Sequence, residues 1–312
     1  MNMLLSDCFC PRITLTITLI LIRAAGECVA QTAKFDWEQT VEVLPGVRLI
    51  SQLETEPRPM RVHCARVDLQ TPGLKLDTTG RTGDWTVNNV ETMRQTTRDF
   101  IRSSQKGDRK IRLAINADAF SPWPAPWNQS TPTNLQGLAI CNGSVVSPGN
   151  GTPSFLIDSE NSASIQVTTP ETPTTNIRTA VSGFGLCLTD GVPQPSGTDL
   201  HPRTGLGLSQ DGRYLSLMII DGRRKSSQGA TTQELGELLR RSGADDGINM
   251  DGGGSSTLAW WNEKSPEPEK CELINAPVGN GLRFESPAAE ELFQPSERAN
   301  GNNLGIYYSV AP

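Results

Sequence analysis

The segment Asp245-Asp-Gly-Ile-Asn-Met-Asp-Gly-Gly-Gly-Ser-Ser-Thr257 decides how the rest of the chain is interpreted. Three consecutive glycines bring no side chain to a core, but they allow close approach of the backbone to another group and present N–H groups that bind anions. The residues on both sides have the pattern of short strands. We therefore predict a strand that delivers Asn249 and Asp251 to a sheet edge, followed by a glycine turn that lies under a ligand. A flexible hairpin is the alternative.

Two more predicted strands end in acidic residues. Ile111–Ile115 leads into Asn116 and Asp118, and Tyr214–Ile220 leads into Asp221. Polar groups at strand ends are placed like functional groups, although an Asx turn that merely stops the strand would use the same residues. The sequence thus offers three candidate catalytic carboxylates, counting the one that precedes the glycines.

The segment His201-Pro-Arg-Thr-Gly-Leu-Gly-Leu208 supplies basic groups. Arginine keeps its charge and binds phosphate through two parallel hydrogen bonds, so we predict Arg203 as a phosphate ligand assisted by Thr204. A surface ion pair is the alternative for Arg203. The imidazole of His201 titrates near neutrality, which suits a proton carrier, and it can equally orient the loop.

Four segments resemble signature motifs of the phosphodiester glycosidase family. Residues 249–256 are similar to N-(L/M)-D-G-G-G-S-(A/S), and residues 116–120, after a helix and a strand, to N-(G/A)-(G/D)-x-F. Residues 201–207 are similar to (H/R)-P-R-T-(A/G)-(L/V)-G, and residues 221–223 to the end of V-D-G-R. The motifs follow one another in the family's order across nearly the whole chain that remains after residue 30.

The resemblance implies an exported hydrolase that cleaves the glycosidic bond of a sugar-1-phosphodiester, of the N-acetylglucosamine-1-phosphodiester type, in a glycan or envelope polymer. Such cleavage uses an acid on the leaving oxygen and a base or nucleophile opposite it. We expect Asp251 as the first catalytic carboxylate, either Asp118 or Asp221 as the second, and His201 as a proton carrier. The expected substrate-binding residues are Arg203, Thr204, Asn116, Asn249, Gly252, Gly253, Gly254 and Ser255.

Other functions use the same residues differently. The acids and amides together can hold Ca²⁺ or Mg²⁺ through oxygen ligands, so a metal remains an alternative although no cofactor is required. The chain lacks the cysteine-rich modules of the animal family members and resembles bacterial members linked to exopolysaccharide or cell-wall glycans. A non-catalytic exported protein that binds glycans during such assembly is the alternative function. No zinc or nucleotide motif is present.

Charge and the N-terminal segment limit the partners. The net charge of −6 and the absence of a basic stripe argue against nucleic acid. Residues 1–30 predict a signal peptide, because Arg12 precedes the apolar stretch Ile13–Ile22 and a cleavage site follows at Ala30. The apolar stretch is too short to span a membrane. We expect a secreted protein, periplasmic or extracellular, without stable membrane insertion after cleavage; an uncleaved anchor is the alternative.

The remaining chain, residues 31–312, predicts one phosphodiester glycosidase-like domain of the α+β class, with a β-rich mixed sheet core and a few packed helices. We predict one helix over Val87–Gln105, capped by Asp84 or Thr86, and a second opened by a capping box at Thr231. The Trp/Pro-rich residues 121–136 predict a rigid loop that stacks on sugars or on itself. Four cysteines permit two disulfides or four free thiols: Cys64, Cys141, Cys187 and Cys271.

Overall fold

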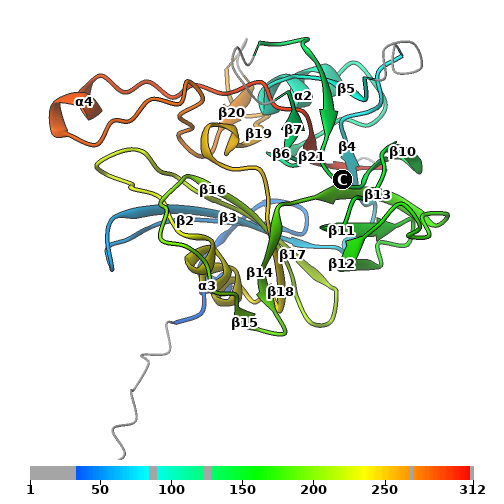
Figure 1. The fold of residues 1–312 in the computed structure, drawn as a ribbon, viewed down its shortest axis with the longest axis horizontal. Coiled ribbons are helices and arrows are strands. Elements are labelled where there is room, and N and C mark those ends of the chain that lie inside the picture. Colours follow the sequence, from blue (N-terminus) through cyan, green and yellow to red (C-terminus); the bar gives the residue numbers. More distant parts are fainter. Residues whose placement is uncertain (1–32, 84–89, 123–127, 267–269, 310–312) are drawn as a thin grey trace, which may run out of the picture. The chain divides into compact units, whose positions relative to one another are not determined.

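Three of the four segments that carry the predicted site lie in an antiparallel sheet of eight strands (Figure 1), whereas Asn116 and Asp118 lie at and after the end of a strand in another sheet. The computed structural model describes residues 33–83, 90–122, 128–266 and 270–309. Its strands follow from runs of alternating or wholly apolar residues, which pack well on a pleated surface. In spatial order they are β1 (Val41–Leu44), β2 (Val47–Glu54), β3 (Met60–Asp68), β17 (Tyr214–Ile220), β16 (Arg203–Leu208), β18 (Asp246–Asn249), β14 (Gly185–Thr189) and β15 (Val192–Pro193).

Three further sheets complete the β structure. One five-stranded sheet contains β10 (Ser144–Ser147), β9 (Ala139–Cys141), β13 (Ile177–Ser182), β11 (Thr152–Asp158) and β12 (Ala163–Thr168). The other contains β20 (Cys271–Leu273), β19 (Leu258–Trp261), β6 (Leu113–Asn116), β21 (Asn303–Tyr308) and β4 (Leu74–Thr78). A small sheet contains β5 (Thr92–Met93), β8 (Pro132–Leu135) and β7 (Phe120–Ser121). The eight-stranded sheet and both five-stranded sheets share one buried apolar cluster, to which Leu206, Phe155 and Ile115 belong.

Few helices accompany the sheets. They are α2 (Thr97–Ser104), α3 (Thr232–Ser242), the short α4 (Pro287–Glu291) and the 3-10 turns η1 (Trp37–Gln39) and η2 (Gly253–Ser255). The predicted capping box opens α3, because the Thr231 side chain accepts from the Glu234 N–H while the Glu234 side chain accepts from the Thr231 N–H. The helix ends at Gly243, whose φ of 100° suits a residue without Cβ. Its leucines pack on the eight-stranded sheet, in a cluster with Met218 and Cys187.

The β-rich core with a few helices is confirmed, and the described residues from Ala33 onward pack as one compact unit. The prediction of a mixed sheet was wrong, because every pairing between the described strands is antiparallel. All four cysteines are free thiols. The hairpin at Asn142-Gly143 links β9 and β10 with positive φ at both residues.

Of the predicted helix over Val87–Gln105, the described residues are helical only over Thr97–Ser104. Thr92 and Met93 form β5 and pair with Thr133 and Pro132 of β8. The helix begins after Thr96, whose side chain accepts from the Asp99 N–H. This local cap, together with strand pairing, overrides a spacing of apolar residues that fits a helix.

Some predictions fall outside the described residues. They are the signal peptide at residues 1–30, the helix caps at Asp84 and Thr86, and the tryptophans at positions 123 and 127 of the predicted sugar-stacking loop. Within the described ranges, no helix is both long enough and apolar enough to cross a membrane.

Candidate active site

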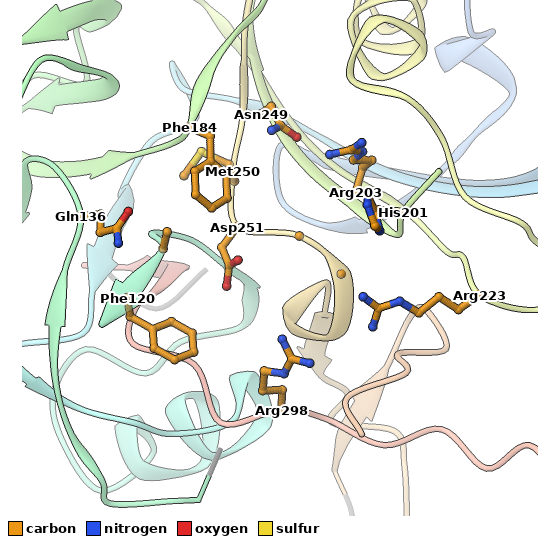
Figure 2. A pocket seen from close by; sticks show the side chains of 13 residues that line it. Phe120, Gln136, Phe184, His201, Arg203, Arg223, Asn249, Met250, Asp251 and Arg298 are labelled. Atoms are coloured by element: carbon orange, nitrogen blue, oxygen red, sulfur yellow. The ribbon is translucent and has the colours of Figure 1, made fainter. Parts of the chain in front are cut away.

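A cavity of about 380 Å³ opens where the C-terminal end of β18 meets the start of β16 (Figure 2). Predicted and unpredicted residues line it together: Ala119, Phe120, Gln136, Phe184, His201, Arg203, Arg223, Asn249, Met250, Asp251, Gly252, Gly253 and Arg298. Of the residues that the sequence proposes, the cavity collects His201, Arg203, Asn249, Asp251 and two of the three glycines. The others lie behind its wall or away from it.

Asp251 is the carboxylate that reaches the cavity. Figure 2 shows its side chain pointing between Phe120 and Arg298. The residue is 3% exposed, and its Oδ2 atom has no hydrogen-bond partner among the described residues. Burial raises the pKa of this carboxyl to about 6, while the Ser255 hydroxyl and the Arg298 guanidinium act in the opposite direction. A carboxyl with such a pKa can exchange a proton near neutral pH.

Asn116 and Thr204 position the Asp251 turn and do not line the cavity. The Asn116 side-chain amide donates to the Asp251 carbonyl (2.7 Å). The amide oxygen accepts from the Thr204 hydroxyl (2.9 Å) and from the Thr257 N–H (3.0 Å). Asn116 is fully buried, as is Thr204. Asn116 and Thr204 were expected to contact the substrate. In the structure their side chains instead hold the backbone of the Asp251 turn, because their hydrogen bonds go to neighbouring protein groups.

The glycine turn lies under arginine side chains. A Cβ on Gly254 would lie 2.6 Å from Cζ of Arg298, and one on Gly253 would lie 3.0 Å from Nη2 of Arg223. The Gly253 N–H donates to the Pro202 carbonyl (2.8 Å), so it is not available to a ligand as the sequence suggested. Gly254 is buried and does not line the cavity. Gly253 and Gly254 thus let guanidinium groups approach the backbone, whereas a Cβ on Gly252 would lie 2.9 Å from the Pro202 carbonyl oxygen.

Three arginines line one side of the cavity. Arg203 donates from Nε to the Ala230 carbonyl (2.8 Å) and from Nη2 to the Asp199 carbonyl (3.0 Å). These neutral acceptors orient its guanidinium without cancelling the charge. Arg298, which is 3% exposed, donates to the Gly279 carbonyl (3.3 Å). Burial lowers the pKa of Arg298 to about 10, a value that still leaves the group charged at neutral pH.

Arg223 extends from a backbone in the left-handed region, with φ of 60°. This conformation is unfavourable for a residue with a long side chain, so the surrounding structure must hold it. Its buried Nη1 atom has no hydrogen-bond partner among the described residues. Figure 2 shows its guanidinium directed toward the glycine turn. Part of this half-buried guanidinium therefore faces the cavity without a protein acceptor.

His201 lines the cavity between the arginines. Burial lowers the pKa of its imidazole, and the charges of Arg203 and Arg223 lower it further. The ring is therefore predominantly neutral at pH 7, so it can accept or donate one hydrogen bond without adding charge.

Asp118 lies behind Asp251 and does not line the cavity. Asp118 is fully buried. Its Oδ1 atom accepts from the Ser182 N–H (2.8 Å), and its Oδ2 atom accepts from the Asn302 side-chain amide (2.7 Å). Burial raises the pKa of this carboxyl well above its usual value, and the nearby Asp251 raises it further. Asp118 can influence the charge of Asp251, but both of its oxygens are engaged by protein.

Asp221 belongs to a different buried network. Its Oδ2 accepts from Arg224 Nη2 (2.7 Å), and its Oδ1 accepts from the Asn275 amide (2.9 Å) and the Ala276 N–H (3.2 Å). The residue is 2% exposed and does not line the cavity. The prediction that Asp221 supplies a second carboxylate finds no geometric support, because this side chain already neutralises a buried arginine.

Apolar groups line the opposite side of the cavity. Phe184 follows β13 and is 56% exposed, although its N–H is fixed by the Asn249 carbonyl (2.8 Å). In Figure 2 Met250 stands beside it and Phe120 lies lower in the view, below the Asp251 carboxylate; all three are on the left of the view, and Arg203 and Arg223 are on the right. Asn249 is 7% exposed, lines the cavity, and has an Oδ1 atom without a partner among the described residues. The cavity therefore has a cationic half and an aromatic half.

The residues around the cavity do not form an obvious metal site. Among the described residues, no group of three or more histidine, cysteine, aspartate or glutamate side chains is arranged to hold an ion. Of the predicted acids, Asp118 lies near Asp251, whereas Asp221 belongs to a separate network in which it pairs with Arg224.

Comparison with known families identifies the fold. The phosphodiester glycosidase family model matches residues 109–289, more than half of the chain. The chain belongs to the phosphodiester glycosidase family. No curated protein matches it in sequence. The matched region contains the Asp251 turn, His201, Arg203 and Arg223, whereas Arg298 lies beyond it.

Solved structures with low sequence identity share this family fold. The catalytic domain of zebrafish N-acetylglucosamine-1-phosphodiester α-N-acetylglucosaminidase, auto-inhibited by its pro-peptide, matches with a TM-score of 0.60 and 17% identity, over 86% of this chain and 85% of that one. A hypothetical protein from Synechocystis matches with a TM-score of 0.58 and 11% identity, over 86% and 63%. A protein from Burkholderia pseudomallei K96243, described as exported, matches with a TM-score of 0.50 and 14% identity, over 80% and 74%.

Arg223, Phe184 and Arg298 are among the cavity residues that were not predicted as site residues. Arg223 ends the segment that resembles V-D-G-R, so the motif itself marks this arginine as well as Asp221. Phe184 stands between Gly183 and Gly185, and an aromatic residue between glycines is a usable signal for an exposed ring. Arg298 has no local sequence signal, because its place over the glycine turn depends on contacts between residues far apart in the chain.

Proposed function

We propose that this protein hydrolyses the glycosidic bond of a sugar-1-phosphodiester. The observation that carries the proposal is the division of one cavity into an arginine half and an aromatic half, with the Asp251 carboxylate between them. A sugar-1-phosphodiester has the matching parts: a sugar ring with apolar faces, an anionic phosphate, and the bond to be broken at their junction.

The arginine half suits the phosphate. Guanidinium groups form charge-assisted hydrogen bonds with phosphate oxygens, and Arg203 and Arg223 make no ion pair among the described residues. Arg298 adds a third positive charge that partly offsets Asp251. On the other side, the exposed ring of Phe184 can stack on the sugar, while the free Asn249 oxygen can accept from a sugar hydroxyl.

Asp251 is assigned the role of general base. Its carboxylate takes a proton from water as the water oxygen bonds to the anomeric carbon, and the bond between that carbon and the phosphate oxygen breaks. The electron pair of the broken bond stays on the phosphate, which leaves as a monoester whose increased charge the arginines stabilise. Because the phosphate is a good leaving group in this cationic site, a second carboxylic acid is not required.

The natural substrate is proposed to be a GlcNAc-1-phosphodiester or a related unit in a glycan or envelope polymer outside the cytoplasm. The family match and the similarity to the zebrafish enzyme support the chemistry. The similarity to the Burkholderia protein supports export. No metal or other cofactor enters the proposed step.

The test is release of free sugar from a GlcNAc-1-phosphodiester by the wild type and by Asp251→Asn, with Asp190→Asn as a matched control on the surface. Turnover by the wild type and the control, with loss of at least about a thousandfold in Asp251→Asn, is the expected result for removal of the base. Turnover that survives in Asp251→Asn would exclude the assigned role. Tight binding of the diester without turnover, across several sugars and with or without Ca²⁺ or Mg²⁺, would favour a glycan-binding protein.

A further inference from the structure

A second cavity, of about 320 Å³, is lined by Leu200, Lys225, Gln228, Arg283 and Glu285. None of these residues lines the first cavity or has a role in the step proposed above. The lining contains no aromatic residue, in contrast to the sugar-binding half of the first cavity. It contains two basic side chains, Lys225 and Arg283, and one acidic side chain, Glu285.

The backbone of Arg223 places this cavity beside the first. The Arg223 N–H donates to the Gln228 carbonyl (3.4 Å), and the Arg223 carbonyl accepts from the Phe284 N–H (2.6 Å). Gln228 lines the second cavity, and Arg283 lines it directly before Phe284. Arg223 therefore has its guanidinium in the first cavity and its backbone against the wall of the second.

A second connection runs through His201. Leu200 lines the second cavity, and the next residue, His201, lines the first. Arg283 is close enough to contribute to lowering the pKa values of both Arg223 and His201. The two cavities thus adjoin on the arginine side, away from Phe184.

The charges of the second cavity are accessible and incompletely paired. The Lys225 ammonium makes no hydrogen bond or ion pair among the described residues. The backbone N–H of Lys225 donates to the Phe284 carbonyl (2.9 Å). Arg283 pairs with Glu285 (2.6 Å), and both side chains are more than half exposed. One positive charge therefore remains in excess, and the exposed Arg283–Glu285 pair can open at little cost to meet a ligand anion.

We propose that the second cavity binds a second phosphate, carried by the leaving group of the substrate. This inference rests on the proposed function, because it assumes that the scissile phosphate lies against Arg203 and Arg223. The group attached to that phosphate then extends on the same side, toward Lys225 and Arg283. The substrate class that meets this requirement is a glycan in which phosphodiesters recur, so that the next phosphate occupies the second cavity.

The experiment compares two diesters of GlcNAc-1-phosphate: one with methanol, and one with glycerol phosphate, whose leaving group carries a second phosphate. We expect the wild type to have about a fivefold higher kcat/KM for the second substrate in low salt, as one or two solvent-exposed charge pairs would give. The preference is expected to decrease as salt is raised to 1 M. A short poly(glycosyl phosphate) oligomer, assayed in parallel, distinguishes a polymer substrate from a small bisphosphate.

The paired variant Lys225→Ala/Arg283→Ala is expected to lose the preference while keeping its activity on the methyl diester within about twofold. The control Lys106→Ala/Lys110→Ala removes the same charge outside both cavities and should keep the preference. Equal kcat/KM for both diesters in the wild type, or a preference that survives in Lys225→Ala/Arg283→Ala, would overturn the inference.

Binding separates failure of this inference from failure of the proposed function. Calorimetry with Asp251→Asn measures the dissociation constants of both diesters without turnover. Tighter binding of the two-phosphate ligand, abolished by Lys225→Ala/Arg283→Ala in the same background, supports the second cavity even if the wild type hydrolyses neither diester. Equal binding of both ligands to Asp251→Asn contradicts it even if both are hydrolysed.

Discussion

The guanidinium of Arg298 lies against Gly254, so closely that a Cβ at residue 254 would be 2.6 Å from Cζ. Arg298 lies 44 positions after this glycine in the chain and follows the segment that contains α4. The absence of a side chain at Gly254, the last glycine of the run, thus allows the buried Arg298 guanidinium to lie beside Asp251. This relation connects the most recognisable segment of the sequence to a residue that no motif marks.

Gly254→Ala is therefore expected to displace Arg298 and to weaken phosphate binding. We expect KM for a GlcNAc-1-phosphodiester to rise about tenfold or more, as loss of one charge-assisted contact would give. Steady-state kinetics check this, with Gly197→Ala as the control, since a Cβ at position 197 meets no atom within 4 Å. An unchanged KM in Gly254→Ala would show that Arg298 does not contact the phosphate.

The activity should depend on pH through Asp251. Because the base must be ionised, kcat/KM is expected to rise with pH and level off above the carboxyl pKa of about 6. The pKa of His201 is lowered, so its deprotonation would also make kcat/KM rise with pH. His201→Asn is therefore the control, and it should retain the rise of kcat/KM with pH. In Arg298→Gln the rise of kcat/KM should move to higher pH, because the guanidinium charge lowers the pKa of Asp251 in the wild type. If kcat/KM no longer rose with pH in His201→Asn, the histidine would be the general base.

The same carboxyl should make the native state less stable at neutral pH. The folded pKa of about 6 lies above the unfolded value of about 3.9, so the folded state binds the proton more tightly. The free energy of unfolding contributed by this group is highest below pH 4 and is lost as pH rises through 6. Asp251→Asn, which resembles the protonated acid, should raise the free energy of unfolding at pH 7 by about 1–3 kcal/mol. Urea unfolding at pH 7 should show this gain, and at pH 4 it should be nearly absent.

The sequence predicts well those features that depend on neighbouring residues. The capping box at Thr231, the hairpin at Asn142-Gly143 and the placement of Asp251 at the end of β18 each follow from a few adjacent positions. The helix predicted from Val87 is not formed at Thr92 and Met93, because the structure there depends on residues far away in the chain. The pairing of Thr92 and Met93 with β8, about forty residues away, leaves no trace in the local apolar pattern.

The roles of the polar residues were harder to predict than their positions. Asn116, Thr204 and Asp221 follow or begin strands as functional residues do, yet each is consumed by hydrogen bonds to the protein. A sequence cannot distinguish a polar group that faces a cavity from one that faces a neighbouring strand. The cavity arginine at position 298 is the converse case, because only the tertiary structure brings it to the glycine turn.

Asp221→Asn tests the distinction between a structural and a catalytic acid. The Asp221 and Arg224 side chains are 1% and 8% exposed, so the substitution leaves a buried arginine without its counter-charge. We expect the free energy of unfolding to fall by about 3–5 kcal/mol. Activity per folded molecule, measured at low temperature where the variant remains folded, should stay within a few-fold of the wild type. A loss of several hundredfold with folding intact would restore Asp221 to the catalytic group.

Phe184→Ala should affect substrate binding while leaving the fold unchanged. The ring is 56% exposed and lies at the cavity, so its removal creates no internal void, and stability should change by no more than about 0.5 kcal/mol. Loss of stacking on the sugar should raise KM about three- to tenfold, and Phe184→Trp should restore most of it. Leu292→Ala is the control, because this side chain is 77% exposed and does not line the cavity. If Phe184→Ala changed inhibition by inorganic phosphate as much as it changed KM, the ring would contact the phosphate side, and the assignment of the two halves of the cavity would be wrong.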